Sequence, residues 1–222
     1  MRTIAVVSRK GGSGKTTVAV QLAIGLWLRG RRTLLADTDP QHSSLEVLRN
    51  RHGDGPDAVM SAGAKLFTLQ AGAVRDGVDA LIIDTPAVVE EETAQAIVLA
   101  DLAVMVLRPT FLDLAAAVHT SRLIRQLRKP GLLILNQAPV ARGAVEPPAV
   151  KRTLEALQLL RLPVAPAMLR SRAIFQTAME HGRSAEELEP DGPAGRETAQ
   201  MCEFLQRFTF GEARAQSGGA QG

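Results

Sequence analysis

The sequence has almost no cysteine and very few aromatic residues. Its 222 residues include one cysteine, Cys202, and no tyrosine, and aromatic residues make up 3% of the chain. A single cysteine excludes a disulfide framework, a zinc cluster within one chain and a multi-cysteine redox motif. So few aromatic rings argue against a stacking platform for single-stranded nucleic acid. With no disulfide framework to form, the expected compartment is the cytoplasm.

Long apolar runs are missing as well. No stretch reaches the roughly 18 apolar residues that a membrane-spanning helix needs, and the N-terminus reads as a strand rather than a signal peptide. We therefore expect no contact with a membrane. The net charge of +3 and the isoelectric point near 9.5 permit nucleic-acid binding without arguing strongly for it.

Short apolar runs alternate with helical segments along the chain. Strands are expected at five such runs, which are residues 3–8, 33–37, 80–84, 102–107 and 132–136. Helices are expected over 16–28 and around 90–100, 111–129 and 146–160. Continuous apolar strands separated by helices predict an α/β fold of three layers, in which helices cover both faces of a doubly wound, mostly parallel sheet. One domain is expected over residues 1–210; residues 54–64 read as a loop and residues 211–222 as a disordered tail.

A glycine-rich segment lies between the first strand and the first helix, and its residues are Lys10, Gly11, Gly12, Ser13, Gly14, Lys15, Thr16 and Thr17. The segment matches the phosphate-binding loop G-x-x-x-x-G-K-[ST], except that Arg9 replaces the first glycine. Glycines let backbone N–H groups approach phosphate oxygens, and the N-terminus of the following helix favours negative charge. Lys15 is expected to reach the β- and γ-phosphates and Thr16 to bind Mg²⁺. The alternative is a glycine turn with solvated lysines.

Acidic side chains follow the second and third expected strands, at the edge where open α/β sheets bind ligands. Asp84 is expected to hold Mg²⁺ through water. Asp37 and Asp39 are two residues apart, and Pro40 favours extended backbone at Asp39, so both side chains are expected on one side. We expect Asp37 beside the metal and Asp39 to orient the attacking water. Alternatively, one of them only caps the next helix, near Ser43.

These segments resemble the motifs of the ParA/MinD superfamily of ATPases, also called the SIMIBI class of P-loop NTPases. KGGSGKTT (10–17) is similar to the deviant Walker A loop, LLADTDPQ (34–41) to Walker A′ and LIIDTP (81–86) to Walker B. The resemblance extends to about residue 208. It implies ATP and Mg²⁺ as ligands, and a homodimer in which Lys10 reaches the nucleotide of the partner subunit. A lysine before the glycines can neutralise phosphate charge in trans, as arginine fingers do, or can simply be exposed to solvent.

The same resemblance implies that Asn136, at the end of the last strand, contacts adenine. An asparagine that satisfies a local turn is the alternative. Lys10, Lys15 and Asp39 are the residues expected to take part in catalysis.

Features that this sequence lacks narrow the choice among the groups of proteins within the superfamily. Iron–sulfur members of the superfamily need cysteine pairs, and its tyrosine kinases carry a C-terminal tyrosine cluster. MinD proteins end in a basic amphipathic helix, whereas this tail is rich in Gly, Ala and Gln. Longer partition ATPases begin with a helix-turn-helix, which is not expected before a strand that starts at residue 3. What remains resembles small ParA-type ATPases of the ParF-like and Soj-like kind, also in segments 108–117 and 169–188.

Such proteins, by this resemblance, bind double-stranded DNA non-specifically as ATP dimers, sit on the nucleoid, and position a plasmid, chromosome or protein cluster. A ParB-like or adaptor protein stimulates their weak hydrolysis of ATP. Candidate DNA contacts are Arg142 and either Arg170 or Arg172. A second cationic set shares one face of the helix around 111–129, or is only a solvated surface; it comprises Arg122, Arg125 and Lys129, with Arg128 beside them.

No base-reading motif is visible, so any DNA binding is expected to be independent of sequence. Two other classes of function stay open. One is a metabolic ATP-dependent ligase or synthetase on the same fold. The other is a nucleotide-switched regulator that does not bind DNA.

Overall fold

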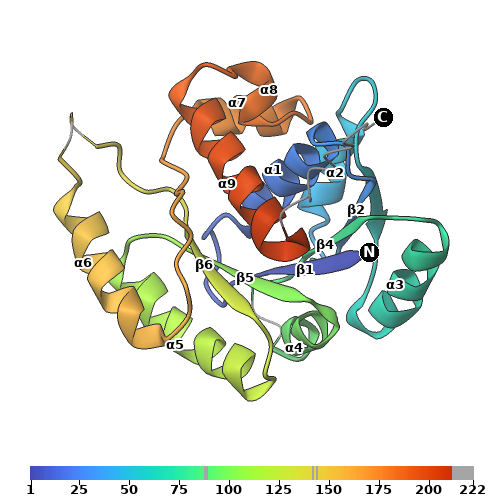
Figure 1. Cartoon of the computed structure of the whole chain (residues 1–222), viewed down its shortest axis with the longest axis horizontal. Helices are drawn as coiled ribbons and strands as arrows, with labels where there is room; N and C mark the ends of the chain where they lie inside the picture. The colour runs from blue at the N-terminus through green and yellow to red at the C-terminus, as the bar shows by residue number, and fades with distance from the viewer. Residues whose placement is uncertain (88–89, 142, 144, 212–222) are drawn as a thin grey trace, which may run out of the picture.

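The structure is a computed structural model of the whole chain, and it describes residues 1–87, 90–141, 143 and 145–211 (Figure 1). Within these residues, one sheet contains six strands, which are β1 (Arg2–Val7), β2 (Thr33–Asp37), β3 (Asp57–Met60), β4 (Ala80–Asp84), β5 (Leu102–Leu107) and β6 (Gly131–Leu135). The strand order is β3-β2-β4-β1-β5-β6, and every pairing is parallel. The predicted doubly wound parallel sheet is therefore confirmed.

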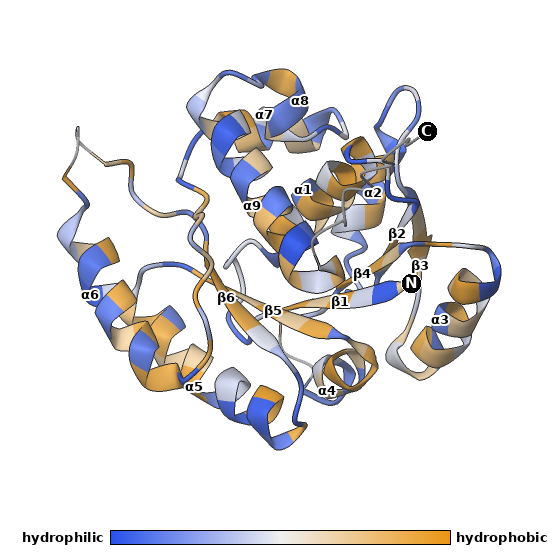
Figure 2. Ribbon diagram, in the orientation of Figure 1, coloured by the Kyte–Doolittle hydropathy of each residue, from blue (hydrophilic) through white to orange (hydrophobic). Residues whose placement is uncertain are grey.

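Helices cover both faces of the sheet, as the continuous apolar strands require. One face carries α1 (Lys15–Leu28), α2 (Ser43–Arg49), α7 (Ile174–Glu180), α8 (Ala185–Leu188) and α9 (Pro193–Phe210). The other carries α3 (Leu66–Arg75), α4 (Glu90–Leu99), α5 (Phe111–Gln126) and α6 (Pro148–Leu157). Figure 2 shows mostly apolar strands between these two layers, and helices that carry both polar and apolar residues. Two hydrophobic clusters, one on each face of the sheet, form the core.

The sequence predicted a loop over residues 54–64 and a disordered tail over residues 211–222. The prediction that residues 54–64 form a loop is wrong, because Asp57–Met60 is the edge strand β3 and pairs with β2. The composition of this segment does not indicate a strand. β3 is partly exposed and flanked by glycine and proline, so it lacks the continuous apolar run of the buried strands. Of the expected tail, residues 212–222 lie outside the described residues.

Helix α1 packs closely against α9 at a glycine. A Cβ atom on Gly25 would lie 2.2 Å from the Sγ atom of Cys202, so only glycine fits this helix crossing without a shift. Burial raises the pKa of the Cys202 thiol to about 12. The thiol therefore stays protonated at neutral pH, and it packs against α1 as a small apolar group.

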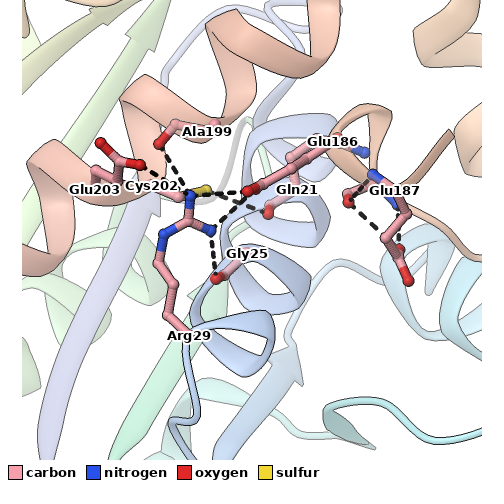
Figure 3. A network of polar contacts seen from close by, with 9 residues as sticks. Gln21, Gly25, Arg29, Glu186, Glu187, Ala199, Cys202 and Glu203 are labelled. Atoms are coloured by element: carbon pink, nitrogen blue, oxygen red, sulfur yellow. Dashed lines mark hydrogen bonds and ion pairs between the residues drawn. The ribbon is translucent and has the colours of Figure 1, made fainter. Parts of the chain in front are cut away.

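A polar network beside this crossing fixes the C-terminal end of α1 (Figure 3). The Arg29 guanidinium donates two hydrogen bonds of 2.9 Å to the carboxylate of Glu186 and one of 2.8 Å to the carbonyl of Gly25. Further along α1, the buried Gln21 side chain accepts a 2.7 Å hydrogen bond from the backbone N–H of Ala185. These contacts hold α1 against α8 and α9, so the N-terminus of α1 is presented at a fixed position. None of the described helices combines the length and apolar composition needed to cross a membrane.

Candidate functional site

The carboxyl ends of three neighbouring strands are tied together. In the parallel register Asp84 of β4 lies opposite Val6 of β1 on one side and opposite Asp37 of β2 on the other. The Thr38 hydroxyl donates a 2.7 Å hydrogen bond to the carbonyl of Asp84, and the Thr85 hydroxyl donates one of 2.8 Å to the carbonyl of Val6. The glycine loop and the acidic segments therefore meet at one edge of the sheet.

The glycine loop itself has the backbone geometry of a phosphate cradle. Gly12 and Gly14 have φ values of +73° and +88°, in the left-handed region that favours glycine, and α1 begins directly at Lys15. A Cβ atom on Gly14 would lie 2.0 Å from Nδ2 of Asn136. The loop can take this shape only because these positions lack side chains. Its N–H groups and the N-terminus of α1 are suited to bind an anion.

The end of β6 supports the loop from the side. Nδ2 of Asn136 donates a 2.9 Å hydrogen bond to the carbonyl of Ser13, and Nε2 of Gln137 donates one of 3.2 Å to the carbonyl of Gly12. The Asn136 amide nitrogen thus bonds to the loop and not to a local turn. Its contact with adenine stays a prediction.

Lys15 lies under the loop among carboxylates. Its residue is only 6% exposed, and burial lowers the pKa of its ammonium, while Asp84 and Asp39 act in the opposite direction. An ammonium buried this deeply needs anions around it. Lys15 is thus placed between the acidic strand ends and the cradle, where it can meet a phosphate.

Asp84 is the most unusual group of the site. It is fully buried, and neither of its carboxylate oxygens has a hydrogen-bond partner among the described residues. Burial, and then the nearby charge of Asp37, raise the pKa of Asp84 to about 7, although the nearby charge of Lys15 acts in the opposite direction. A buried carboxylate without partners is costly, so the site is suited to a cation that would bind these oxygens.

The sequence left two roles open for Asp37, a place beside the metal or a cap of the next helix, and its contacts in the structure bear on the second. One of its carboxylate oxygens accepts hydrogen bonds of 2.7 Å from the Ser44 hydroxyl and 3.0 Å from the N–H of Leu45, so it caps the start of α2 from outside the helix. Its other oxygen accepts a 3.1 Å bond from the N–H of Asp39. Asp37 therefore does cap α2, and both the alternative that this is its only role and its predicted role at a metal stay open.

Asp39 approaches the site from a turn. The strand β2 ends at Asp37, and Asp39 lies in a bend in which its side chain accepts a 2.9 Å hydrogen bond from the N–H of Gln41. The two aspartates thus come from a strand and from the bend after it, and not from one continuous extended segment. Asp39 is partly exposed, so it can still contact a water molecule.

The donor set of the site suits Mg²⁺ bound together with phosphate. Mg²⁺ prefers oxygen ligands, keeps several waters, and usually takes one or two carboxylates with phosphate oxygens. Asp84, Asp37 and the Thr16 hydroxyl supply such oxygens near the cradle. The described residues contain no group of three or more His, Cys, Asp or Glu side chains that could hold a metal ion.

Lys10 lies at the start of the loop and is half-buried. Its backbone N–H donates a 3.3 Å hydrogen bond to the Ser8 hydroxyl. In the described part of the chain its ammonium has no hydrogen-bond or ion-pair partner. The side chain is thus available for an anion.

The arginines predicted to contact DNA have other partners or lie outside the described residues. Arg142 is among the latter. Arg170 forms an ion pair of 2.5 Å with Glu146, and Arg172 forms one of 2.8 Å with Glu197. Both guanidinium groups are thus neutralised within the chain, and a DNA contact would have to compete with these pairs.

The second predicted cationic set is more accessible. Three residues of it, which we call the α5 cationic face, are exposed and have no ion pair among the described residues; they are Arg122, Arg125 and Arg128. Lys129, the fourth residue of the predicted set, is not included in this face, because its ammonium donates a 3.1 Å hydrogen bond to the carbonyl of Ala100.

Sequence reasoning missed two residues of the site. Gln137 supports the loop as described above, and Arg108 lies beside the loop, with Nη1 3.7 Å from where a Cβ atom on Gly12 would be. The available signal was their position at the carboxyl edge of the sheet, because Arg108 directly follows β5 and Gln137 lies two residues after the end of β6. Gln137 bonds to a loop 125 residues away, and Arg108 approaches the same loop, neither of which a sequence pattern reveals.

The pKa of Asp84 leads to a prediction for the ligand-free protein. Between pH 4 and about 7 the folded protein keeps a proton that the unfolded chain releases near the ordinary pKa of 3.8. The free energy of unfolding should therefore fall as pH rises through this range. Denaturant unfolding at several pH values should show this slope, and Asp84→Asn should flatten it. The exposed control Asp76→Asn should keep the wild-type slope. If Asp84→Asn keeps it too, the raised pKa does not belong to Asp84.

Comparisons with known proteins place this site in a family. A model described as the CobQ/CobB/MinD/ParA nucleotide binding domain matches residues 4–189. Maintenance of carboxysome distribution protein A from Halothiobacillus neapolitanus is 30% identical over 205 residues, covering 89% of this chain and 91% of that protein. The protein of the same name from Gloeobacter kilaueensis is 32% identical over 203 residues, covering 86% and 90%.

Solved structures agree on the fold. Apo McdA from Cyanthece superposes with a TM-score of 0.75 at 17% identity, covering 92% of this chain and 99% of that one. The septum site-determining protein MinD from Pyrococcus horikoshii, complexed with Mg-ADP, gives a TM-score of 0.73 at 19% identity, covering 93% and 96%. The predicted resemblance to the ParA/MinD superfamily is confirmed. The chain belongs to the CobQ/CobB/MinD/ParA family of nucleotide-binding domains.

Proposed function

We propose that the chain is an ATP-dependent switch that dimerises around bound nucleotide, binds DNA without sequence preference and positions a cargo. The observation that carries this proposal is the buried Asp84 carboxylate beside Lys15, at a glycine loop that begins with Lys10; among the described residues neither this carboxylate nor the Lys10 ammonium has a hydrogen-bond partner. Such a site is incomplete until phosphate and a divalent cation fill it. A bound triphosphate would also bring an anion to Lys10.

Within one subunit, each residue has a role that its position supports. The loop N–H groups and Lys15 would bind the β- and γ-phosphates of ATP, and Thr16, Asp37 and Asp84 would hold Mg²⁺ directly or through water. The bound ion would neutralise charge that develops on the phosphate oxygens. Asp39, partly exposed in its turn, would orient the water that attacks. Hydrolysis would give ADP and phosphate.

Lys10 would join two subunits. In this proposal each copy lends its Lys10 ammonium to the nucleotide of the other, so the dimer is stable only while a triphosphate is present. A single γ-phosphate then controls a two-state assembly, as in other nucleotide switches. Hydrolysis would return the protein to single subunits.

DNA binding would use exposed cations on the dimer. The α5 cationic face is the better supported surface, because its arginines are exposed and form no ion pair within the described residues, whereas Arg170 and Arg172 are held by carboxylates. Contacts of this kind neutralise phosphates and carry no sequence information. The protein would then reside in the cytoplasm on the nucleoid.

The names of the relatives support a proposal for the cargo. Two relatives named for carboxysome distribution match most of this chain, another relative is named as a chromosome-partitioning ATPase, and one solved structure of the same fold is named for plasmid partition. We propose that this chain positions a comparable large assembly, which is a protein cluster, a plasmid or a chromosome. An adaptor or ParB-like protein would stimulate its weak ATP hydrolysis.

Binding of a random-sequence DNA duplex tests the proposal. With Mg-ATP the protein should bind the duplex, and with Mg-ADP binding should weaken by at least about tenfold, because only the dimer presents two cationic faces at once. The affinity with ATP should also fall steeply with salt. Binding that ignores the nucleotide would contradict the switch. No binding at low salt would favour the DNA-free regulator, or a ligase or synthetase if a small-molecule substrate is then consumed with ATP.

A further inference from the structure

Arg108 carries a positive charge next to the glycine loop, on the side away from the acidic residues. It follows β5, which pairs with β1, and the strand order places β5 on one side of β1 and the acidic ends of β4 and β2 on the other. Nη1 of Arg108 lies 3.7 Å from the position that a Cβ atom on Gly12 would occupy. A phosphate chain in the cradle would therefore have carboxylates and metal on one side and Arg108 on the other.

The guanidinium is held in a fixed orientation by Asp113. Its Nε and Nη2 atoms donate hydrogen bonds of 3.2 Å and 3.0 Å to the two carboxylate oxygens of Asp113, in the forked geometry that only arginine provides. Nη1 is not used in this pair, and it has no partner among the described residues. The free end of the fork is the one that faces the loop.

Asp113 is itself firmly held. Its side chain is 1% exposed, and it accepts a further hydrogen bond of 2.6 Å from the hydroxyl of Thr110, the N-cap residue of α5. Burial alone would raise the pKa of Asp113, but the hydrogen bonds from Arg108 and Thr110 lower it, so the carboxylate stays charged. The start of α5 thus serves as a support that keeps Arg108 beside the loop.

We propose that Arg108 is a phosphate-binding residue that contacts the terminal phosphate of a bound nucleoside triphosphate and favours triphosphate over diphosphate. The inference rests on the proposed function, because it needs a nucleotide in the cradle. Lys15 would bind the β- and γ-phosphates from its own side of the loop, and Nη1 of Arg108 lies beside Gly12 of the same loop, so Arg108 is placed to add a second charge to the terminal phosphate from the side away from the carboxylates. A diphosphate would leave Nη1 of Arg108 without a hydrogen-bond partner among the described residues.

The test compares affinities for a non-hydrolysable ATP analogue and for ADP, each with Mg²⁺, by titration calorimetry. In Arg108→Gln the affinity for the triphosphate should fall about tenfold and that for ADP by less than about threefold, as expected when one charge-assisted hydrogen bond is lost. Arg108→Lys keeps the charge but not the forked geometry, so its affinity for the triphosphate should lie between those of the wild type and Arg108→Gln. Arg75→Gln, the same change at an exposed site in the last turn of α3, is the matched control and should change neither affinity.

A purely structural pair predicts a different result. If Arg108 only neutralises Asp113, then Arg108→Gln should lower the melting temperature while the ratio of the two affinities stays at the wild-type value, and this outcome overturns the inference. Arg108→Lys keeps the ratio measurable if the glutamine variant does not fold. Failure of the proposed function looks different again, because the wild-type protein would then bind neither nucleotide.

Discussion

Replacing Lys15 with alanine is expected to lower the affinity for Mg-ATP by at least about 100-fold. The ammonium is buried under the glycine loop, where a charge-assisted hydrogen bond to phosphate contributes about 3 kcal/mol and each 1.4 kcal/mol or so is a factor of ten. The loss should exceed this figure if Asp84 becomes harder to ionise. Lys15 is one of the charges that lower the pKa of Asp84, so its removal raises that pKa further and weakens the metal side of the site.

Titration with a fluorescent ATP analogue measures this loss, and Lys65→Ala is the matched control. Lys65 is exposed at the start of α3, so its replacement removes the same charge from a surface position and should leave the affinity unchanged. Thermal unfolding checks that Lys15→Ala is folded at pH 6, where Asp84 can keep its proton. A folded Lys15→Ala that binds ATP as tightly as the wild type would show that the nucleotide does not occupy this cradle.

The part of the site that the sequence predicts correctly is the part set by strand ends. A parallel sheet brings the carboxyl ends of its strands to one edge, so Lys15 and Asp84 had to meet once β1 and β4 were recognised as buried strands. Glycines before a helix likewise predict the loop, since few other residues adopt the backbone angles of Gly12 and Gly14. These inferences use local pattern and topology alone.

The remaining features depend on contacts between distant segments. The pairing of Arg170 with Glu146 joins residues 24 apart, and the hydrogen bond from Asn136 to Ser13 joins residues 123 apart. No periodicity or motif encodes such contacts. β3 escaped prediction for a related reason, because an edge strand is stabilised by its neighbour β2 rather than by its own apolar pattern.

Lys10→Ala is expected to separate nucleotide binding from dimerisation. The side chain has no partner within the described part of its own subunit, so its removal should change the affinity of a single subunit for ATP by no more than about threefold, which is roughly 0.7 kcal/mol. Dimerisation should suffer far more. A symmetric dimer contains the contact twice, and at about 2 kcal/mol for each charged contact the dimer loses about 4 kcal/mol, which is nearly 1,000-fold.

Light scattering on a size-exclusion column, with Mg²⁺ and a non-hydrolysable ATP analogue, measures the fraction of dimer. Arg9→Ala is the sharpest control, because it removes an equal charge one residue earlier from an exposed position. If overall positive charge at the loop were what holds the dimer, Arg9→Ala and Lys10→Ala would weaken it equally. If a directed contact holds it, only Lys10→Ala should give single subunits. A Lys10→Ala protein that still dimerises with the analogue would mean that the triphosphate joins the subunits through other residues.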